Sequence, residues 1–253
     1  MKKKFTMIVV SKKKVIVMAS SLLILLFMIV SLFGHLTNLP ANIFVDPKSG
    51  IIVIDPGHGG VDGGTTKNGI VEKEINLEIS KKLKVFLEEK GYAVVLTREE
   101  DVSLETADGT GGSRHQRDLN TRANIINNSN AQLFLSIHVN CNLNKPFTDG
   151  AIVFYGDKFE QNKTLAYCIQ RALNGMTVNG RKRTVHDPQQ GNYFLLTHSQ
   201  IPGAIVETAF ISNAAERQLL TTDEFREQLA RAIAEGVEQY INEPGKVFAP
   251  EDE

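Results

Sequence analysis

Short apolar segments alternate with amphipathic segments along most of the chain, and this alternation constrains the fold more than any other feature. The apolar segments have the length of buried strands and occupy residues 51–55, 92–97, 132–137, 151–155 and 203–208. Spacings of three and four residues between apolar side chains predict helices over residues 72–91, 117–129, 160–174 and 223–241. Strands that alternate with helices are typical of a parallel sheet. We therefore predict an α/β fold in which helices flank a twisted, mostly parallel sheet.

The N-terminal part of the chain has the composition of a targeting segment. Residues 15–33 carry no charge and follow six lysines in residues 1–14. At ~1.5 Å per residue such a helix nearly spans a hydrocarbon core of about 30 Å, whereas the apolar region of a signal peptide usually has ~7–15 residues. We expect a membrane anchor or a cleaved signal peptide over residues 1–36, a linker over 37–49, one folded domain over 50–243 and a tail over 244–253. Either form of the leader places the domain outside the cytoplasmic membrane.

Charge and cysteine content exclude some classes of protein. Removing the six leader lysines from 28 basic residues leaves 22 against 29 acidic residues, a difference of −7. An acidic domain argues against a protein that holds nucleic acid. Cys141 and Cys168 form no CxxC motif, so a thiolate zinc site is not expected. The sequence leaves open whether the two cysteines form a disulfide or stay unpaired.

Four side chains with acid, base or metal-binding chemistry are expected at one edge of the sheet. His58 lies in the glycine-rich stretch VIDPGHGGVDGG after the first strand, and Glu72 begins the first helix. His138 and Glu207 lie at the ends of the third and the last strand. Ligands of α/β sheets bind beyond the carboxyl ends of the strands. Two histidines and one carboxylate leave Zn²⁺ an open position, and a further carboxylate can move protons during hydrolysis of an amide.

Each of these residues also has a structural interpretation. A histidine after a strand is often only hydrogen-bonded within the fold, and a glutamate at a helix start favours the helix dipole. Glu207 at the end of a buried strand needs a partner. The glycine-rich stretch matches neither GxGxxG nor GxxxxGK[ST], so it does not indicate a phosphate-binding loop. The remaining histidines lie in polar or loop segments and are interpreted as surface or substrate-facing groups: His115, His186 and His198.

Four stretches together resemble a known family in order and spacing. They are VIDPGHGGVDGG, VEKEINLEIS, RDLNTRANIINNSNAQLFLSIHVN and IPGAIVETAFISNAAE. They are similar to the zinc-dependent N-acetylmuramoyl-L-alanine amidases of bacterial cell-wall metabolism, and the resemblance covers residues 50–241. It implies that His58, Glu72 and His138 bind Zn²⁺ and that Glu207 is the catalytic acid/base. Glu74 is a poorer ligand candidate than Glu72.

The resemblance also implies a reaction and a setting. The reaction is hydrolysis of the amide between N-acetylmuramic acid and L-alanine in peptidoglycan. A single domain behind one apolar segment looks most like the sporulation-type members, which act on the spore cortex so that a deacetylase can form muramic δ-lactam for germination. This implies an enzyme of the forespore intermembrane space. An activating lipoprotein is a possible partner, and residues 175–192, with Arg181, Lys182 and Arg183, are expected to be an exposed loop that serves a partner or glycan, or is merely solvated.

Other functions remain open at this point. The alternatives are an amidase of the vegetative wall, a zinc carboxypeptidase or deacetylase acting on another wall bond, and a wall-binding or activator protein without activity. The first two would use the same metal ligands, and the last would need none of them.

Overall fold

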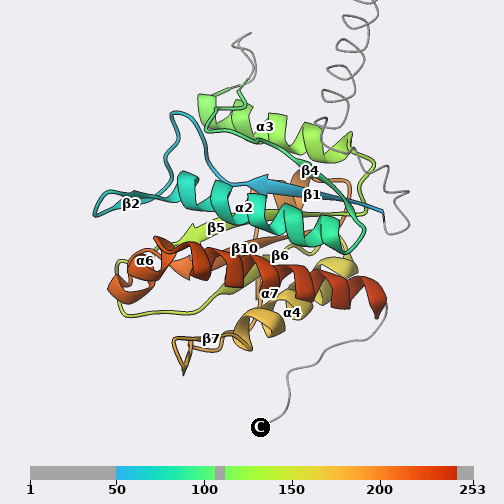
Figure 1. Cartoon of the computed structure of the whole chain (residues 1–253). Helices are drawn as coiled ribbons and strands as arrows, with labels where there is room; N and C mark the ends of the chain where they lie inside the picture. The colour runs from blue at the N-terminus through green and yellow to red at the C-terminus, as the bar shows by residue number, and fades with distance from the viewer. Residues whose placement is uncertain (1–49, 106–111, 244–253) are drawn as a thin grey trace, which may run out of the picture. The chain divides into compact units, whose positions relative to one another are not determined.

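A six-stranded sheet forms the centre of the domain (Figure 1). The computed structural model describes residues 50–105 and 112–243. The strands of the sheet, in spatial order, are β4 (Ala93–Leu96), β1 (Ile51–Pro56), β5 (Leu133–Asn140), β10 (Gly203–Phe210), β6 (Ile152–Tyr155) and β9 (Gln189–Gln190). The first four are parallel, whereas β6 is antiparallel to β10 and β9 is parallel to β6. The predicted α/β fold with a mostly parallel sheet is confirmed, with a reversed edge that the sequence did not predict.

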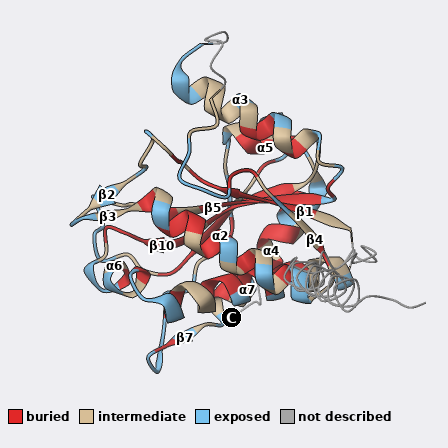
Figure 2. Ribbon diagram, turned by 45° about the horizontal axis from the view of Figure 1, so that its top comes forward, coloured by how far each residue is buried: buried red, intermediate tan, exposed pale blue. Residues whose placement is uncertain are grey.

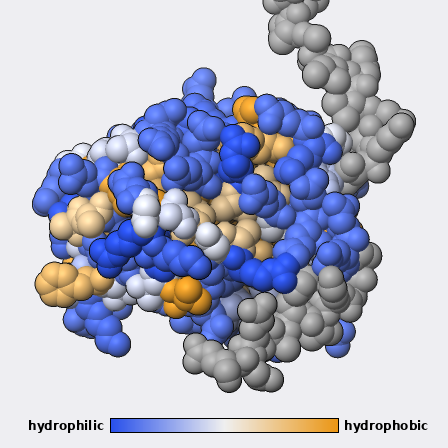
Figure 3. Space-filling view, turned by 60° about the horizontal axis from the view of Figure 1, so that its bottom comes forward, coloured by the Kyte–Doolittle hydropathy of each residue, from blue (hydrophilic) through white to orange (hydrophobic). Residues whose placement is uncertain are grey.

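Helices cover both faces of the sheet (Figures 1 and 2). One face packs against α2 (Glu72–Glu89), α4 (Glu160–Asn174) and α7 (Asp223–Asn242). The other face is covered by α3 (Arg114–Asn127) and the short α5 (Phe194–His198), while α6 (Ala214–Leu220) follows β10. Two small hairpins pair β2 (Thr66–Lys67) with β3 (Ile70–Val71) and β7 (Thr177–Val178) with β8 (Arg181–Lys182). Hydrophilic residues predominate on the face that carries α4 and α7 (Figure 3).

Alternate side chains of the strands enter two separate parts of the core, as the two-residue period of a strand requires. Ile52 and Ile54 of β1 belong to the larger cluster, which also contains apolar residues of α2, α4 and α7. Val53 points to the opposite face, where it joins the cluster that includes Ile126 of α3 and Leu195 of α5. The central strands of the sheet are therefore buried on both sides.

The helix ends follow local signals in the sequence. α2 ends before Gly91, whose φ of 91° suits a glycine after a helix. The side chain of Thr222 accepts a hydrogen bond from the backbone N–H of Phe225 and caps α7. Ser113 caps α3 in the same way, through the N–H of Gln116, so this helix starts three residues before the predicted residue 117.

The segment 175–192 departs from its prediction as an exposed loop. It contains the β7–β8 hairpin and strand β9. Arg181 and Lys182 are exposed, but Arg183 is only 7% exposed and forms an ion pair with Glu216. The prediction that Arg183 serves a partner or a glycan from an exposed loop is therefore wrong, because its guanidinium group is buried inside the domain.

The predicted leader, linker and tail lie outside the described residues. Within residues 50–105 and 112–243, no helix has both the length and the apolar character needed to cross a membrane. Cys141 and Cys168 are both free, so the disulfide that the sequence left open is not formed in this structure.

Candidate metal centre and active site

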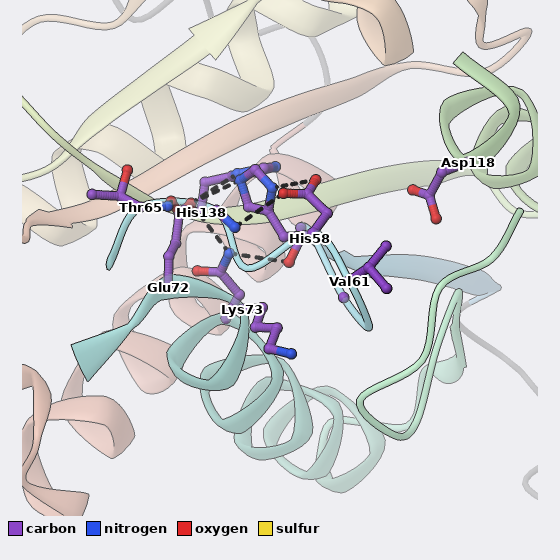
Figure 4. A network of polar contacts seen from close by, with 12 residues as sticks. His58, Val61, Thr65, Glu72, Lys73, Asp118 and His138 are labelled. Carbon is purple, nitrogen blue, oxygen red and sulfur yellow. Dashed lines mark hydrogen bonds and ion pairs between the residues drawn. The ribbon is translucent and has the colours of Figure 1, made fainter. Parts of the chain in front are cut away.

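Three of the predicted site residues converge at the carboxyl ends of β1 and β5 (Figure 4). One possible ligand atom from each of His58, Glu72 and His138 lies within 4.8 Å of the other two. His58 Nε2 and His138 Nδ1 are each 3.2 Å from the same carboxylate oxygen, Glu72 Oε1. The imidazole rings stand edge to face, with centroids 5.0 Å apart and planes at 81°. The two rings and the carboxylate thus face one small volume.

Glycines in the loop after β1 allow these side chains to approach one another. A Cβ atom on Gly57 would lie 2.2 Å from Cε1 of His138, so any side chain at this position would displace the imidazole ring. Gly64 has a φ of +63°, and a Cβ atom there would lie 2.7 Å from Glu72 Oε2 and from His58 Cδ2. Glycine is therefore required at these positions, because the side chains of the cluster pack closely against the loop and, at Gly64, the loop backbone adopts a positive φ.

Glu72 is held in place by main-chain and side-chain donors. The N–H of Thr65 donates to Oε2 at 2.8 Å, and the N–H of Val139 donates to Oε1 at 3.3 Å. Burial opposes ionisation of this carboxyl, but hydrogen bonds from His138 and His58 outweigh it and hold the pKa of Glu72 well below its usual range. The carboxylate is consequently charged at neutral pH and available to a cation.

The ring of His58 is oriented by a second carboxylate. Nδ1–H donates to Oδ2 of Asp62 at 2.8 Å, which leaves Nε2 directed toward Glu72. Burial lowers the pKa of His58, but hydrogen bonds and charge attraction from Glu72 and Asp62 outweigh it and raise the pKa to about 9. A carboxylate that fixes the second ring nitrogen is a recurrent feature around metal-binding histidines. Asp62 was not identified from the sequence, although it lies within the quoted glycine-rich stretch.

Glu207 lies beside the cluster on the neighbouring strand. It is the register partner of His138 in the β10–β5 pair, which places both side chains on the same face of the sheet. Its Oε2 atom is buried without a hydrogen-bond partner in the described structure. Burial raises the pKa of Glu207 to about 7, while the charges of His138 and His58 lower it and that of Glu72 raises it. A half-buried glutamate with a pKa near neutrality and one buried, unpartnered oxygen is suited to accepting and returning a proton.

Two buried arginines hold the loop that carries His58, and neither was assigned a role from the sequence. Arg122 of α3 contacts Oδ1 of Asp55 at 2.6 Å and donates to the carbonyl of His58 at 2.6 Å. Arg98 donates to the carbonyls of Pro56 and Gly57 at 2.9 and 3.0 Å. Asp55 ends a buried strand, so a partner was required by its burial, but nothing local in the sequence indicates which arginine supplies it.

The donor set and its spacing fit a zinc ion. Zinc bonds to imidazole nitrogen and carboxylate oxygen are about 2.0–2.2 Å long, which sets neighbouring tetrahedral ligands about 3.3 Å apart. The nitrogen–oxygen distances of 3.2 Å around Glu72 match that spacing. The three residues leave a fourth position free, which is typical of a catalytic rather than a structural site.

Among the described residues, the other candidates from the sequence are not part of this group of ligand atoms. His186 Nε2 contacts the carbonyl of Asp149, His198 Nδ1 contacts the carbonyl of Phe194, and His115 is exposed. Glu74 is exposed on α2, whereas Glu72 is buried, so only Glu72 can face the histidines. The structure thus brings His58, Glu72 and His138 together.

An α/β sheet with two histidines, a carboxylate and a second, unpaired carboxylate at its strand ends has the architecture of a metal-dependent hydrolase. Comparisons with known proteins narrow this class. The chain belongs to the N-acetylmuramoyl-L-alanine amidase family, whose model matches residues 52–239. Family membership supports N-acetylmuramoyl-L-alanine amidase activity, with peptidoglycan as the fitting substrate.

Individual relatives agree with this family. The germination-specific N-acetylmuramoyl-L-alanine amidase of Bacillus subtilis (strain 168) is 35% identical over 203 residues, which cover 79% of this chain and 83% of the relative. The B. subtilis amidase LytC is 32% identical over 85% of this chain and 40% of its own length. Among solved structures, the CwlD amidase from Clostridioides difficile in complex with the GerS lipoprotein has a TM-score of 0.69 and 34% identity, covering 76% of this chain and 98% of that chain.

Proposed function

We propose that this protein is a zinc-dependent amidase that cleaves the bond between the lactyl group of N-acetylmuramic acid and L-alanine. His58, Glu72 and His138 hold the zinc ion, and Glu207 is the catalytic acid/base. One observation carries the proposal: three converging ligands lie beside Glu207, whose buried Oε2 atom has no hydrogen-bond partner. Residues 50–243 are the catalytic domain.

The chain's own residues supply positioning and proton transfer. When bound, Zn²⁺ supplies Lewis-acid activation of a water molecule and of the amide carbonyl. Glu207 takes the proton from the attacking water and returns it to the alanine nitrogen as the carbon–nitrogen bond breaks. The pKa of Glu207, raised by burial to about 7 in the absence of metal, favours both directions of this transfer. Asp62 keeps the Nε2 atom of His58 directed at the ligand cluster.

Digestion of purified peptidoglycan tests the bond that is cleaved. We expect the zinc-loaded protein to release intact stem peptides with new L-alanine amino termini, because only cleavage next to the lactyl group exposes that nitrogen. Amino-terminal labelling followed by mass spectrometry measures the product. Release of D-alanine would show a carboxypeptidase instead, and release of acetate would show a deacetylase. Either of these products without stem peptides contradicts the proposal.

The spore cortex is the proposed wall layer. Similarity to a germination-specific amidase over 83% of that relative's length and to the CwlD amidase supports this setting. The product, muramic acid without its stem peptide, is then the substrate of a deacetylase that forms muramic δ-lactam. An extracytoplasmic position is consistent with a wall substrate, and we place the enzyme in the forespore intermembrane space, secreted or anchored by residues 1–36. Because the similar CwlD amidase forms a complex with the GerS lipoprotein, we also propose an activating lipoprotein as partner of this chain.

Muropeptide analysis of spores distinguishes cortex from vegetative wall. We expect muramic δ-lactam to disappear from spores that lack this protein, since the lactam can form only after the stem peptide has been removed. Complementation with the wild-type gene is the control. Normal δ-lactam together with unseparated or autolysis-resistant vegetative cells would instead support the alternative, an amidase of the vegetative wall.

A further inference from the structure

The backbone of β10 is irregular immediately after the proposed acid/base. Glu207 pairs with His138 and Phe210 pairs with Asn140, so β10 has two residues where β5 has one. The pairing of β10 with β6 on its other side ends at Glu207, opposite Ile152. A bulge of this kind leaves backbone donors and acceptors without strand partners and redirects the side chains beside it.

A buried ion pair satisfies the backbone groups that the bulge releases. Arg183 Nη2 donates to the carbonyl of Thr208 at 2.8 Å, and the N–H of Phe210 donates to Glu216 Oε2 at 2.7 Å. The two side chains are joined by Arg183 Nε to Glu216 Oε1 at 2.7 Å. Both residues are almost fully buried, at 7% and 3% exposure. The ion pair therefore binds backbone groups that would pair with β6 if the β10–β6 hydrogen-bond ladder continued.

The same ion pair also binds the chain that leads into β6. The N–H of Gly150 donates to Glu216 Oε1 at 3.0 Å, and its carbonyl accepts from Arg183 Nη2 at 2.7 Å. The guanidinium group of Arg183 lies 5.2 Å from the ring centroid of Phe225 in α7, which holds it from a further side. Gly150 and the bulge of β10 are thus connected through two side chains rather than through backbone pairing.

Thr208 links this arrangement to the metal ligands. Its hydroxyl donates to the carbonyl of His138 at 2.9 Å, while its own carbonyl is the one bound by Arg183. Glu207, the preceding residue, has an Oε2 atom without a hydrogen-bond partner. Because no hydrogen bond holds this oxygen, the direction of the carboxylate depends on the backbone that carries it.

We propose that the Arg183–Glu216 ion pair is a positioning element for Glu207: it fixes the bulge of β10 and thereby directs the carboxylate toward the reacting water. The inference rests on the proposed function of Glu207. Lysine at position 183 keeps the charge but cannot bind Glu216 and the carbonyls of Gly150 and Thr208 together, because it lacks the planar fork of arginine.

The variant Arg183→Lys tests this role in the zinc-loaded, full-length protein with a soluble muropeptide as substrate. We expect kcat to fall about 10–100-fold, since a displacement of about 1 Å in a catalytic group has an effect of that order. KM and the zinc content per chain are expected to stay unchanged, because the substrate contacts and the three ligands are intact. Hydrogen exchange should accelerate at the amides of Gly150 and Phe210 and stay as in the wild type over residues 51–72.

Two further variants separate positioning from general stability. The double variant Arg183→Met with Glu216→Gln leaves no unpaired buried charge. If Arg183→Lys does not fold, kcat, KM, zinc content and hydrogen exchange of this double variant test the positioning role instead. Ile169→Val is the matched control, because it removes one methyl group from a fully buried α4 residue and removes none of the hydrogen bonds that hold the bulge. Its melting temperature should fall while its kcat, measured below the transition, stays at the wild-type value.

The outcomes for the two proposals are distinct. Loss of kcat in Glu207→Gln together with full kcat in Arg183→Lys would overturn the positioning role and leave the proposed function intact. A fall in kcat that merely follows melting temperature, with Ile169→Val affected equally, would also overturn it. Full kcat in Glu207→Gln would remove the proposed catalytic role of Glu207 and the positioning role with it.

Discussion

Replacing Glu207 by glutamine is expected to lower kcat on peptidoglycan by about 10²–10⁴-fold, the usual contribution of a positioned acid/base. Glutamine has nearly the same shape but cannot take a proton from water. The zinc content should remain that of the wild type, because the ligand cluster does not include Glu207. Rates of stem-peptide release and zinc content by atomic absorption measure the two effects on the same samples.

The fold should tolerate this replacement. Burial raises the pKa of Glu207 from 4.5 to about 7 in the metal-free protein. Ionisation is therefore more costly in the folded than in the unfolded chain. The resulting loss of stability accumulates as the pH rises from about 4.5 to about 7 and is complete above that pH. Glutamine removes that cost, so at pH 8 the metal-free variant should melt no lower than the wild type. Glu74→Gln, the same change at an exposed position of α2, is the control and should keep full kcat. Wild-type kcat in Glu207→Gln would disprove the assignment.

The location of the site could be predicted from the sequence because its signals are local. An apolar run predicts a strand, and the parallel connection between strands places their carboxyl ends at one edge of the sheet. His58 and His138 follow or end such runs, and Glu72 starts a helix directly after the glycine-rich loop. No distance between these residues had to be known for the prediction that they lie close together.

The supporting contacts could not be predicted in this way because they join residues far apart in the chain. Arg122 and Asp55 are separated by 67 residues, and Arg183 and Glu216 by 33. Arg183 follows two exposed basic residues, so the composition of this segment predicted a surface loop. The side chain of Arg183 nevertheless points into the domain, toward a buried partner. Which residues form an ion pair over such a separation in the sequence depends on the completed fold.

Local sequence signals also could not predict the short helix α5 or the direction of strand β6. α5 has five residues, which is too few for a helical period to show. The apolar segment 151–155 predicted a strand correctly, but an apolar run has the same appearance in either direction, and β6 proves to be antiparallel to β10.

Removing a proposed ligand should have an effect at least as large as removing the acid/base. We expect His58→Ala and His138→Ala to lose stoichiometric zinc and, with it, detectable stem-peptide release, because two remaining ligands do not form a catalytic zinc site. The matched control is His198→Ala, which removes a histidine that stacks on Phe194 outside the cluster and should leave both zinc content and rate unchanged. Full zinc content in either ligand variant would contradict the assignment of that histidine.

Zinc binding should also depend on pH in a direction that the site defines. Zinc binds the neutral imidazole, whereas hydrogen bonds and charge attraction from Glu72 and Asp62 overcome burial and raise the pKa of His58 to about 9 in the metal-free protein. Below that pH the metal must displace a proton from His58, so apparent affinity should rise about tenfold per pH unit between pH 7 and 8.5 and level off above 9. Competition with a chromophoric chelator measures the slope, and Asp62→Asn should reduce it, because the loss of one carboxylate lowers the pKa of His58. An affinity independent of pH over this range would show that His58 is not a ligand that exchanges a proton for the metal.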